Sequence, residues 1–280
     1  MKKLLLAAAA FGTLATATPV LADHHGEAKA ALQAVLADDR RGDDGARDQY
    51  RNPVETLDFF QVKPDMTVVE YGPGGGWYTR VLAPYIMPKG KYIAINSDSD
   101  AGTYRNRAAE ARAKGWTERF KTGLAELMDM EADDVTAFEI DEMPEEMAGT
   151  VDRVLIFRSM HGLNIGNNAD DVLKAARTML ADDGMVGVVQ HRAPEGASYD
   201  DYGAKQRGYM RQQDVVAIFA ANGFELADSS EVNANPKDPA NWERGVWTLP
   251  PVLRYGDENR AKYEAIGESD RMTLLFKKAD

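Results

Sequence analysis

Three side chains that can move protons or bind anions lie at the ends of two apolar runs. Arg158 and His161 follow the run Val151–Phe157, and His191 ends a second such run. An imidazole with an ordinary pKa of about 6.5 accepts a proton near neutral pH, so either histidine could serve as a general base. The alternative for each histidine is a structural side chain bonded to backbone. The alternative for Arg158 is an ion pair with an acid such as Asp141.

A glycine-rich turn follows a third apolar run. In Val68-Val69-Glu70-Tyr71-Gly72-Pro73-Gly74-Gly75-Gly76, an acidic residue precedes three alternate glycines. Glycine lets the backbone approach a ligand closely, and the helix that follows offers free N–H groups. The pattern predicts a small-molecule site in which Glu70 anchors the polar end of the ligand. Its spacing differs from the Gly-x-Gly-x-x-Gly of dinucleotide enzymes, and a tight turn without a ligand is the alternative.

Apolar runs alternate with helical periodicity from Thr67 onward, which predicts a parallel sheet covered by helices. The expected strands are residues 67–71, 91–96, 135–140, 151–157, 185–190, 224–227 and 272–277. The expected helices between them are residues 77–86, 101–128 with a break near Gly115, 169–180 and 212–221. Ligands bind beyond the carboxyl ends of the strands in such a sheet. We therefore expect the glycine turn, Arg158 and both histidines to meet at one edge.

The glycine turn resembles motif I of class I S-adenosylmethionine-dependent methyltransferases, and the succession of strands is similar to that fold. The resemblance implies a doubly wound α/β domain with a mostly parallel, seven-stranded, Rossmann-like sheet and an antiparallel last strand. Residues 47–53, 157–161 and 188–192 resemble a family of exported, largely uncharacterised predicted methyltransferases. The resemblance covers about residues 47–278.

The resemblance implies S-adenosylmethionine as the methyl donor. The residues implied to contact it are Glu70, Gly72, Gly74, Gly76, Asn96, Asp98 and Asp141. Glu70 and the glycines would surround the amino-acid moiety of the donor, and Asp141 would lie where the adenine amine is contacted. Asn96 stands where such enzymes present a carboxylate to the ribose hydroxyls. It can still bond a diol, without charge assistance, and Asp98 could substitute for it.

The resemblance also implies a small-molecule methyl acceptor. His161 is the first candidate for the base that removes its proton, and His191 is the second. Arg158 would hold an acidic acceptor or the carboxylate of the donor. A metal site built from both histidines and a carboxylate is a less favoured use of these side chains. A different function class is an exported ligand-binding or metal-binding protein that keeps the fold without the activity.

The first 22 residues have the features of a secretory signal peptide. Two lysines precede the apolar stretch at residues 4–17, and Val20-Leu21-Ala22 fits a cleavage site. We expect a periplasmic or secreted protein without a membrane anchor after cleavage, and an uncleaved anchor is the alternative. A mature chain beginning Asp23-His24-His25 could bind Cu(II) or Ni(II) through its amine and His25, or form a free tail.

The rest of the chain divides into residues 23–66 and 67–280. The first part contains expected helices at residues 28–36 and 53–60, which could form a lid, and the second is the methyltransferase-like domain. Residues 236–268 are rich in Pro, Gly and charge and form a long excursion. The 280-residue chain has a formal net charge of −12 and no Cys. We expect no nucleic-acid partner and no thiolate chemistry, and the oligomeric state stays open.

Overall fold

The structure is a computed structural model that describes residues 20–202 and 207–279. Most of the expected signal peptide therefore lies outside the described residues. Within the described residues, no helix combines the length and apolar character that a membrane span requires.

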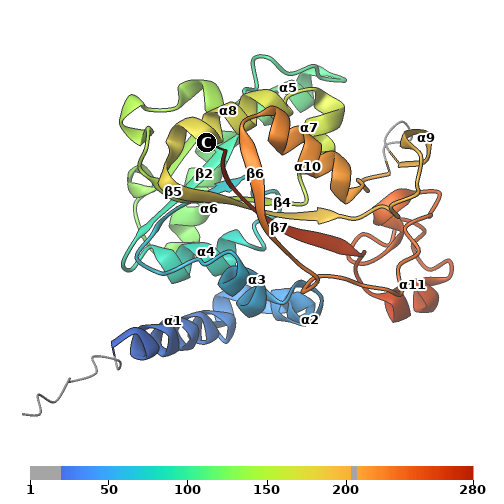
Figure 1. Cartoon of the computed structure of the whole chain (residues 1–280), viewed down its shortest axis with the longest axis horizontal. Coiled ribbons are helices and arrows are strands. Elements are labelled where there is room, and N and C mark those ends of the chain that lie inside the picture. Colours follow the sequence, from blue (N-terminus) through green and yellow to red (C-terminus); the bar gives the residue numbers. More distant parts are fainter. Residues whose placement is uncertain (1–19, 203–206, 280) are drawn as a thin grey trace, which may run out of the picture.

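The described strands form one seven-stranded sheet in the order β3-β2-β1-β4-β5-β7-β6 (Figure 1). The strands are β1 Thr67–Tyr71, β2 Lys91–Asn96, β3 Thr136–Glu139, β4 Val151–Phe157, β5 Leu180–His191, β6 Phe224–Ser230 and β7 Arg271–Lys278. β1 to β5 pair in parallel, and β7 lies antiparallel between β5 and β6. The predicted doubly wound, mostly parallel sheet with an antiparallel last strand is confirmed.

Helices cover both faces of the sheet (Figure 1). The α-helices are α1 Val20–Leu36, α2 Asp48–Arg51, α3 Pro53–Phe59, α4 Thr79–Ile86, α5 Arg107–Lys114, α6 Trp116–Met128, α7 Met160–Gly166, α8 Ala169–Met179, α9 Tyr199–Tyr202, α10 Gln212–Ala221 and α11 Arg260–Ile266. Shorter 3₁₀ segments span Asp39–Arg47, Ala132–Asp134, Ile140–Glu142, Glu145–Met147 and Gly245–Thr248. The expected helix over residues 101–128 does break at Gly115. The strand expected at residues 185–190 is longer and begins at Leu180.

Two apolar cores lie against the two faces. Successive side chains of a strand point to opposite faces, so Val69 of β1 packs in a core with α7, α8 and α10. Its neighbour Val68 packs in the other core, with α1, α3, α4 and α6. Both residues are fully buried. The strand order reverses between β1 and β4, and this switch point is where doubly wound sheets bind ligands.

Residues 39–51 contact both the glycine turn and the segment just before β7. Trp77, just after the turn, donates its Nε1 hydrogen to the backbone oxygen of Asp44 at 3.1 Å. Farther along, Arg51 donates to the carboxylate of Glu268, 217 residues away in the chain. The segment at residues 39–51 therefore lies along the edge of the sheet where the candidate site is expected.

Candidate functional site

The glycine turn has a backbone that favours glycine. Gly72, Gly74 and Gly76 have φ angles of +59°, +60° and +73°, in the left-handed region that L side chains rarely adopt. A Cβ on Gly72 would lie 3.4 Å from the hydroxyl of Ser159, so the turn after β1 closely approaches the turn after β4. The alternate glycines are therefore explained by the shape of this turn and by its packing against Ser159.

Glu70 lies beneath the turn, with its carboxylate directed at α4 and β2. Its Oε2 accepts hydrogen bonds from the hydroxyls of Tyr92 at 2.6 Å and Thr79 at 2.9 Å. The side chain is 2% exposed, and this burial raises the pKa of the carboxyl to about 7 despite both hydroxyl donors. Glu70 thus fixes the base of the turn and exists as a mixture of charged and neutral forms near neutral pH.

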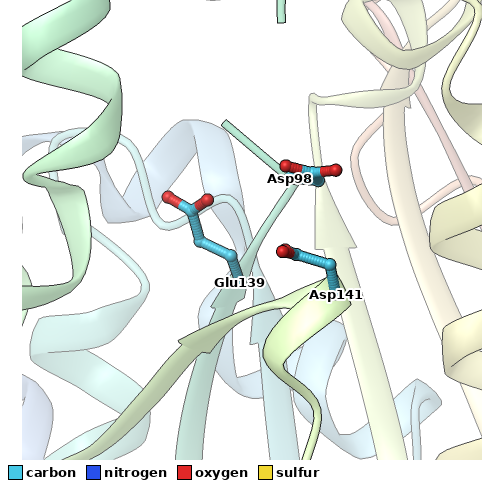
Figure 2. Close-up of side chains that lie close together, drawn as sticks. All are labelled: Asp98, Glu139 and Asp141. Carbon is cyan, nitrogen blue, oxygen red and sulfur yellow. The ribbon is translucent and has the colours of Figure 1, made fainter. Parts of the chain in front are cut away.

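Three carboxylates gather at the ends of β2 and β3 (Figure 2). The ligand-capable oxygens of Asp98, Glu139 and Asp141 all lie within 4.8 Å of one another. Asp98 also accepts from the backbone nitrogens of the two residues at positions 100 and 101. Glu139 accepts from the backbone nitrogen of Ser99 at 2.7 Å. The group can accept hydrogen bonds from hydroxyls or amines and has the ligand type that hard cations prefer.

Sequence reasoning brought Asp98 and Asp141 to this edge but missed Glu139. Glu139 is the last residue of β3 and is 7% exposed, whereas the sequence predicts a strand over residues 135–140 and so places Glu139 inside it rather than at its end. Asn96, at the end of β2, uses its side-chain oxygen to accept from the backbone nitrogen of Ser97 at 3.0 Å.

The ends of β4 and β5 bring the other predicted residues together. The rings of His161 and His191 have centroids 5.9 Å apart. Arg158 has a φ of +55°, and its backbone nitrogen donates to the backbone oxygen of Val189 at 2.6 Å. This bond holds a strained residue at the strand end, as is common at functional sites. Arg158 forms no ion pair with Asp141 in the described part of the chain.

Both imidazoles favour their neutral form. Burial lowers the pKa of His161, and Arg158 acts in the same direction. Burial also lowers the pKa of His191, well below its ordinary value, and the charges of His161 and Arg158 add to this effect. Desolvation disfavours the charged imidazolium. At neutral pH each ring therefore has a lone pair that can accept a proton.

Each ring is positioned by a residue from another segment. His191 Nδ1 lies 2.5 Å from the hydroxyl of Ser269, which precedes β7. His161 Nδ1 lies 3.4 Å from the amide nitrogen of Gln190, which is long for a hydrogen bond and does not fix the tautomer. The ring of Trp247 meets His161 edge-on at 6.0 Å. Ser269 and Trp247 could not be placed from sequence, because both come from the excursion or its end.

A cavity of about 290 Å³ joins the two halves of this edge. Gly72 and Asn96 line it from the donor side predicted by sequence, and Arg158 and His161 line it from the other side. A larger cavity of about 650 Å³ lies between α10 and the excursion. Its lining includes Arg192 and Asp270 but neither the glycine turn nor the histidines. The smaller cavity is therefore the candidate active site.

No family model matches this chain, and no curated protein matches it. A geranyl diphosphate methyltransferase solved with GPP and sinefungin is similar in structure, with a TM-score of 0.50 and 15% identity over 81% of this chain and 77% of that one. A geranyl diphosphate C-methyltransferase from Streptomyces coelicolor A3(2) has a TM-score of 0.49 and 13% identity, covering 82% of this chain and 76% of that one.

A SAM-dependent methyltransferase from Aquifex aeolicus has a TM-score of 0.46 and 20% identity, covering 73% of this chain and 93% of that one. Identities this low inform on fold alone. Taken with the strand order, the match at a TM-score of 0.50 shows that the chain has the class I methyltransferase fold. A fold does not determine a function, which depends on the residues of the site.

Proposed function

We propose that this protein transfers a methyl group from S-adenosylmethionine to a small-molecule acceptor. The main support for the proposal is that Gly72 of the glycine turn and His161 after β4 line the same cavity. It lies at the switch point of the sheet, where the fold binds its ligands. The donor supplies an electrophilic methyl group on a sulfonium. The residues of this chain bind and orient the donor and the acceptor, and they remove a proton from the acceptor.

The donor side of the cavity offers backbone and acceptor groups. The left-handed glycines keep the turn after β1 free of side chains, so that backbone can contact the amino-acid moiety of the donor. Asp98, Glu139 and Asp141 do not line the cavity, but at the neighbouring ends of β2 and β3 they present carboxylate oxygens suited to ribose hydroxyls and an adenine amine. The amide of Asn96 adds a neutral partner beside them.

The acceptor side offers a neutral base. An acceptor O–H or N–H in the cavity would lose its proton to His161, and the freed lone pair would attack the methyl carbon in line with the departing sulfur. Holding both partners in this alignment supplies most of the rate enhancement, and the base assists. His191 has its ring 5.9 Å from that of His161 but does not line the cavity, and it is the second candidate for this role, with Ser269 as its orienting partner.

Calorimetric titration with S-adenosylmethionine and S-adenosylhomocysteine tests the donor site. Gly74 is exposed in the turn at a left-handed φ, and a Cβ there would meet only the backbone oxygen of Gly72, at 3.8 Å. We expect the unmodified protein to bind both compounds and Gly74→Trp to lose binding. Gly123→Trp is the control, because Gly123 lies on the exposed face of α6 with open space around it.

Methyl transfer needs a second readout, because a binding protein would also pass the titration. The protein is incubated with methyl-labelled donor and a small-molecule extract, and label in the extract is counted. We expect His161→Ala to slow transfer by about 10²- to 10⁴-fold while S-adenosylhomocysteine binding stays within about twofold, since the base acts on the acceptor. A folded protein that binds neither compound would refute the proposed function.

A further inference from the structure

Three arginines pair with one buried carboxylate, and a fourth, Arg158, lies near this group and lines the cavity. Glu268 is 5% exposed and accepts from Arg47 at 2.7 Å and from Arg51 and Arg271 at 3.1 Å. Arg158 acts electrostatically within the same group, because the charges of Arg271 and Glu268 both affect its pKa. In a chain with a net charge of −12, this corner is locally cationic.

Glu268 is used by the other three arginines and leaves Arg158 without a carboxylate partner. Nη1 of Arg158 is buried and has no hydrogen-bond partner among the described residues. The nearby Glu70 directs its carboxylate to the hydroxyls of Thr79 and Tyr92 instead. A buried donor without a partner is rare in proteins and usually indicates a missing ligand or water.

A second unpartnered donor lies beside the first. Tyr78 is 2% exposed, its ring stacks on Phe157 at 3.4 Å, and its hydroxyl lacks a hydrogen-bond partner in residues 20–202 and 207–279. The Arg158 guanidinium lies 5.9 Å from the centre of the Tyr78 ring. Burial raises the pKa of this hydroxyl to about 12, so it stays protonated and can donate.

These contacts favour a ligand that accepts hydrogen bonds and carries negative charge. Resting on the proposed function, we propose that the methyl acceptor is a small organic acid whose carboxylate is bound by Arg158 and Tyr78 beside His161. A guanidinium matches a carboxylate in charge and geometry. The cavity of about 290 Å³ is just below the usual range for ligand pockets, roughly 300–1,000 Å³, and it would have to hold the acid beside the reacting end of the donor, so the acid is small.

The donor has a carboxylate of its own, which could also be the group that Arg158 binds. The two sources differ in what they require of Arg158. If Arg158 binds an acidic acceptor, removing its charge leaves donor affinity unchanged. If Arg158 binds the donor carboxylate, the same change weakens S-adenosylhomocysteine but not 5′-methylthioadenosine, which lacks the amino-acid moiety.

Titrations of the protein with three kinds of probe distinguish binding of an acidic acceptor from binding of the donor carboxylate. The probes are S-adenosylhomocysteine, 5′-methylthioadenosine, and a series of monocarboxylates from acetate to benzoate with their neutral amides. Arg158→Gln removes the charge, Arg158→Lys keeps it, and Tyr78→Phe removes the hydroxyl but keeps the stacked ring. Arg192→Gln is the control, because Arg192 pairs with Glu231 and Asp270 outside this cavity. Thermal melting confirms that each variant is folded.

We expect at least one acid to bind while its amide does not. Arg158→Gln should weaken that acid roughly tenfold or more, as expected for a charge-assisted hydrogen bond, and leave S-adenosylhomocysteine within about twofold. Arg158→Lys should retain part of the affinity. Equal binding of acids and amides, no acid binding, or selective loss of S-adenosylhomocysteine in Arg158→Gln would each overturn the inference. Acid binding in a protein that fails to bind either adenosine compound would contradict the proposed function alone.

Discussion

Glu70→Gln should change how the stability of the protein depends on pH. Glu70 is buried beneath the glycine turn, where its pKa is raised to about 7 from 4.5. Gln keeps a side-chain oxygen that can accept from Thr79 and Tyr92, as Glu70 Oε2 does at 2.9 and 2.6 Å. The substitution therefore removes the titrating proton while preserving the hydrogen bonds that hold the turn.

The free energy of unfolding should fall as pH rises, because the pKa of Glu70 is raised in the folded protein. Between pH 4.5 and 7 the folded protein keeps the Glu70 proton that the unfolded chain has released, so rising pH lowers the free energy of unfolding. At about 1.4 kcal/mol per pKa unit, the full cost of ionising Glu70 in the fold is roughly 3 kcal/mol. Between pH 5.5 and 8 the free energy of unfolding should fall by about 2 kcal/mol for this reason. Glu70→Gln has no such titrating proton and should not show this fall.

Urea unfolding at several pH values between 5.5 and 8 measures the effect. The free energy of unfolding of Glu70→Gln minus that of the unmodified protein should rise by about 2 kcal/mol across this range. Glu264→Gln is the control, because Glu264 is about half exposed and pairs with Arg260 on α11. Parallel pH profiles for the unmodified protein and Glu70→Gln would refute the assignment of a buried, raised pKa to Glu70.

Two further substitutions test the packing of the site. Glu268→Gln should lower the free energy of unfolding by about 3–5 kcal/mol, because it leaves buried guanidinium groups without their carboxylate; a loss below 1 kcal/mol in urea unfolding would contradict this. Gly187→Ala should cost about 1–3 kcal/mol, because its Cβ would lie 2.7 Å from the buried ring of Phe60. Gly196→Ala is the control, because Gly196 has open space around it, and it should change the melting temperature little. Equal melting temperatures of the two alanine variants would show that the ring of Phe60 can move to accept the added Cβ.

The central strands were predictable because they are buried on both faces of the sheet. Val151–Phe157 is an almost continuous apolar run, as expected for the centre of a parallel sheet, and β4 has those bounds. The glycine turn was predictable for a similar local reason, since its alternate glycines correspond to left-handed backbone angles. Helix α7 was missed because it spans only seven residues and contains Gly162, too little for a helical period to appear.

Side-chain partners across long sequence separations were not predictable. Ser269 meets His191 because β7 enters the sheet antiparallel beside β5 and pairs His191 with Arg271. Periodicity indicates that such a strand exists but not which of its neighbours faces a given ring. The link from Arg51 to Glu268 spans 217 residues, and neither residue belongs to an apolar pattern that would reveal it. Contacts of this kind thus depend on topology more than on local sequence.

The two ends of the candidate site carry opposite charge. Asp98, Glu139 and Asp141 make the end at β2 and β3 acidic, and the arginines around Glu268 make the end at β4, β5 and β7 basic. The overall negative charge of the protein disfavours the approach of an anion at long range, but salt screens exposed charges beyond about 10 Å. Buried charges are screened less. If the acceptor is the organic acid proposed above, it would be selected at contact by Arg158 and Tyr78, with its carboxylate at the basic end. The adenosine hydroxyls of the donor would then lie at the acidic end. Under the proposed function, this polarity would orient the two substrates head to head across the cavity that His161 lines.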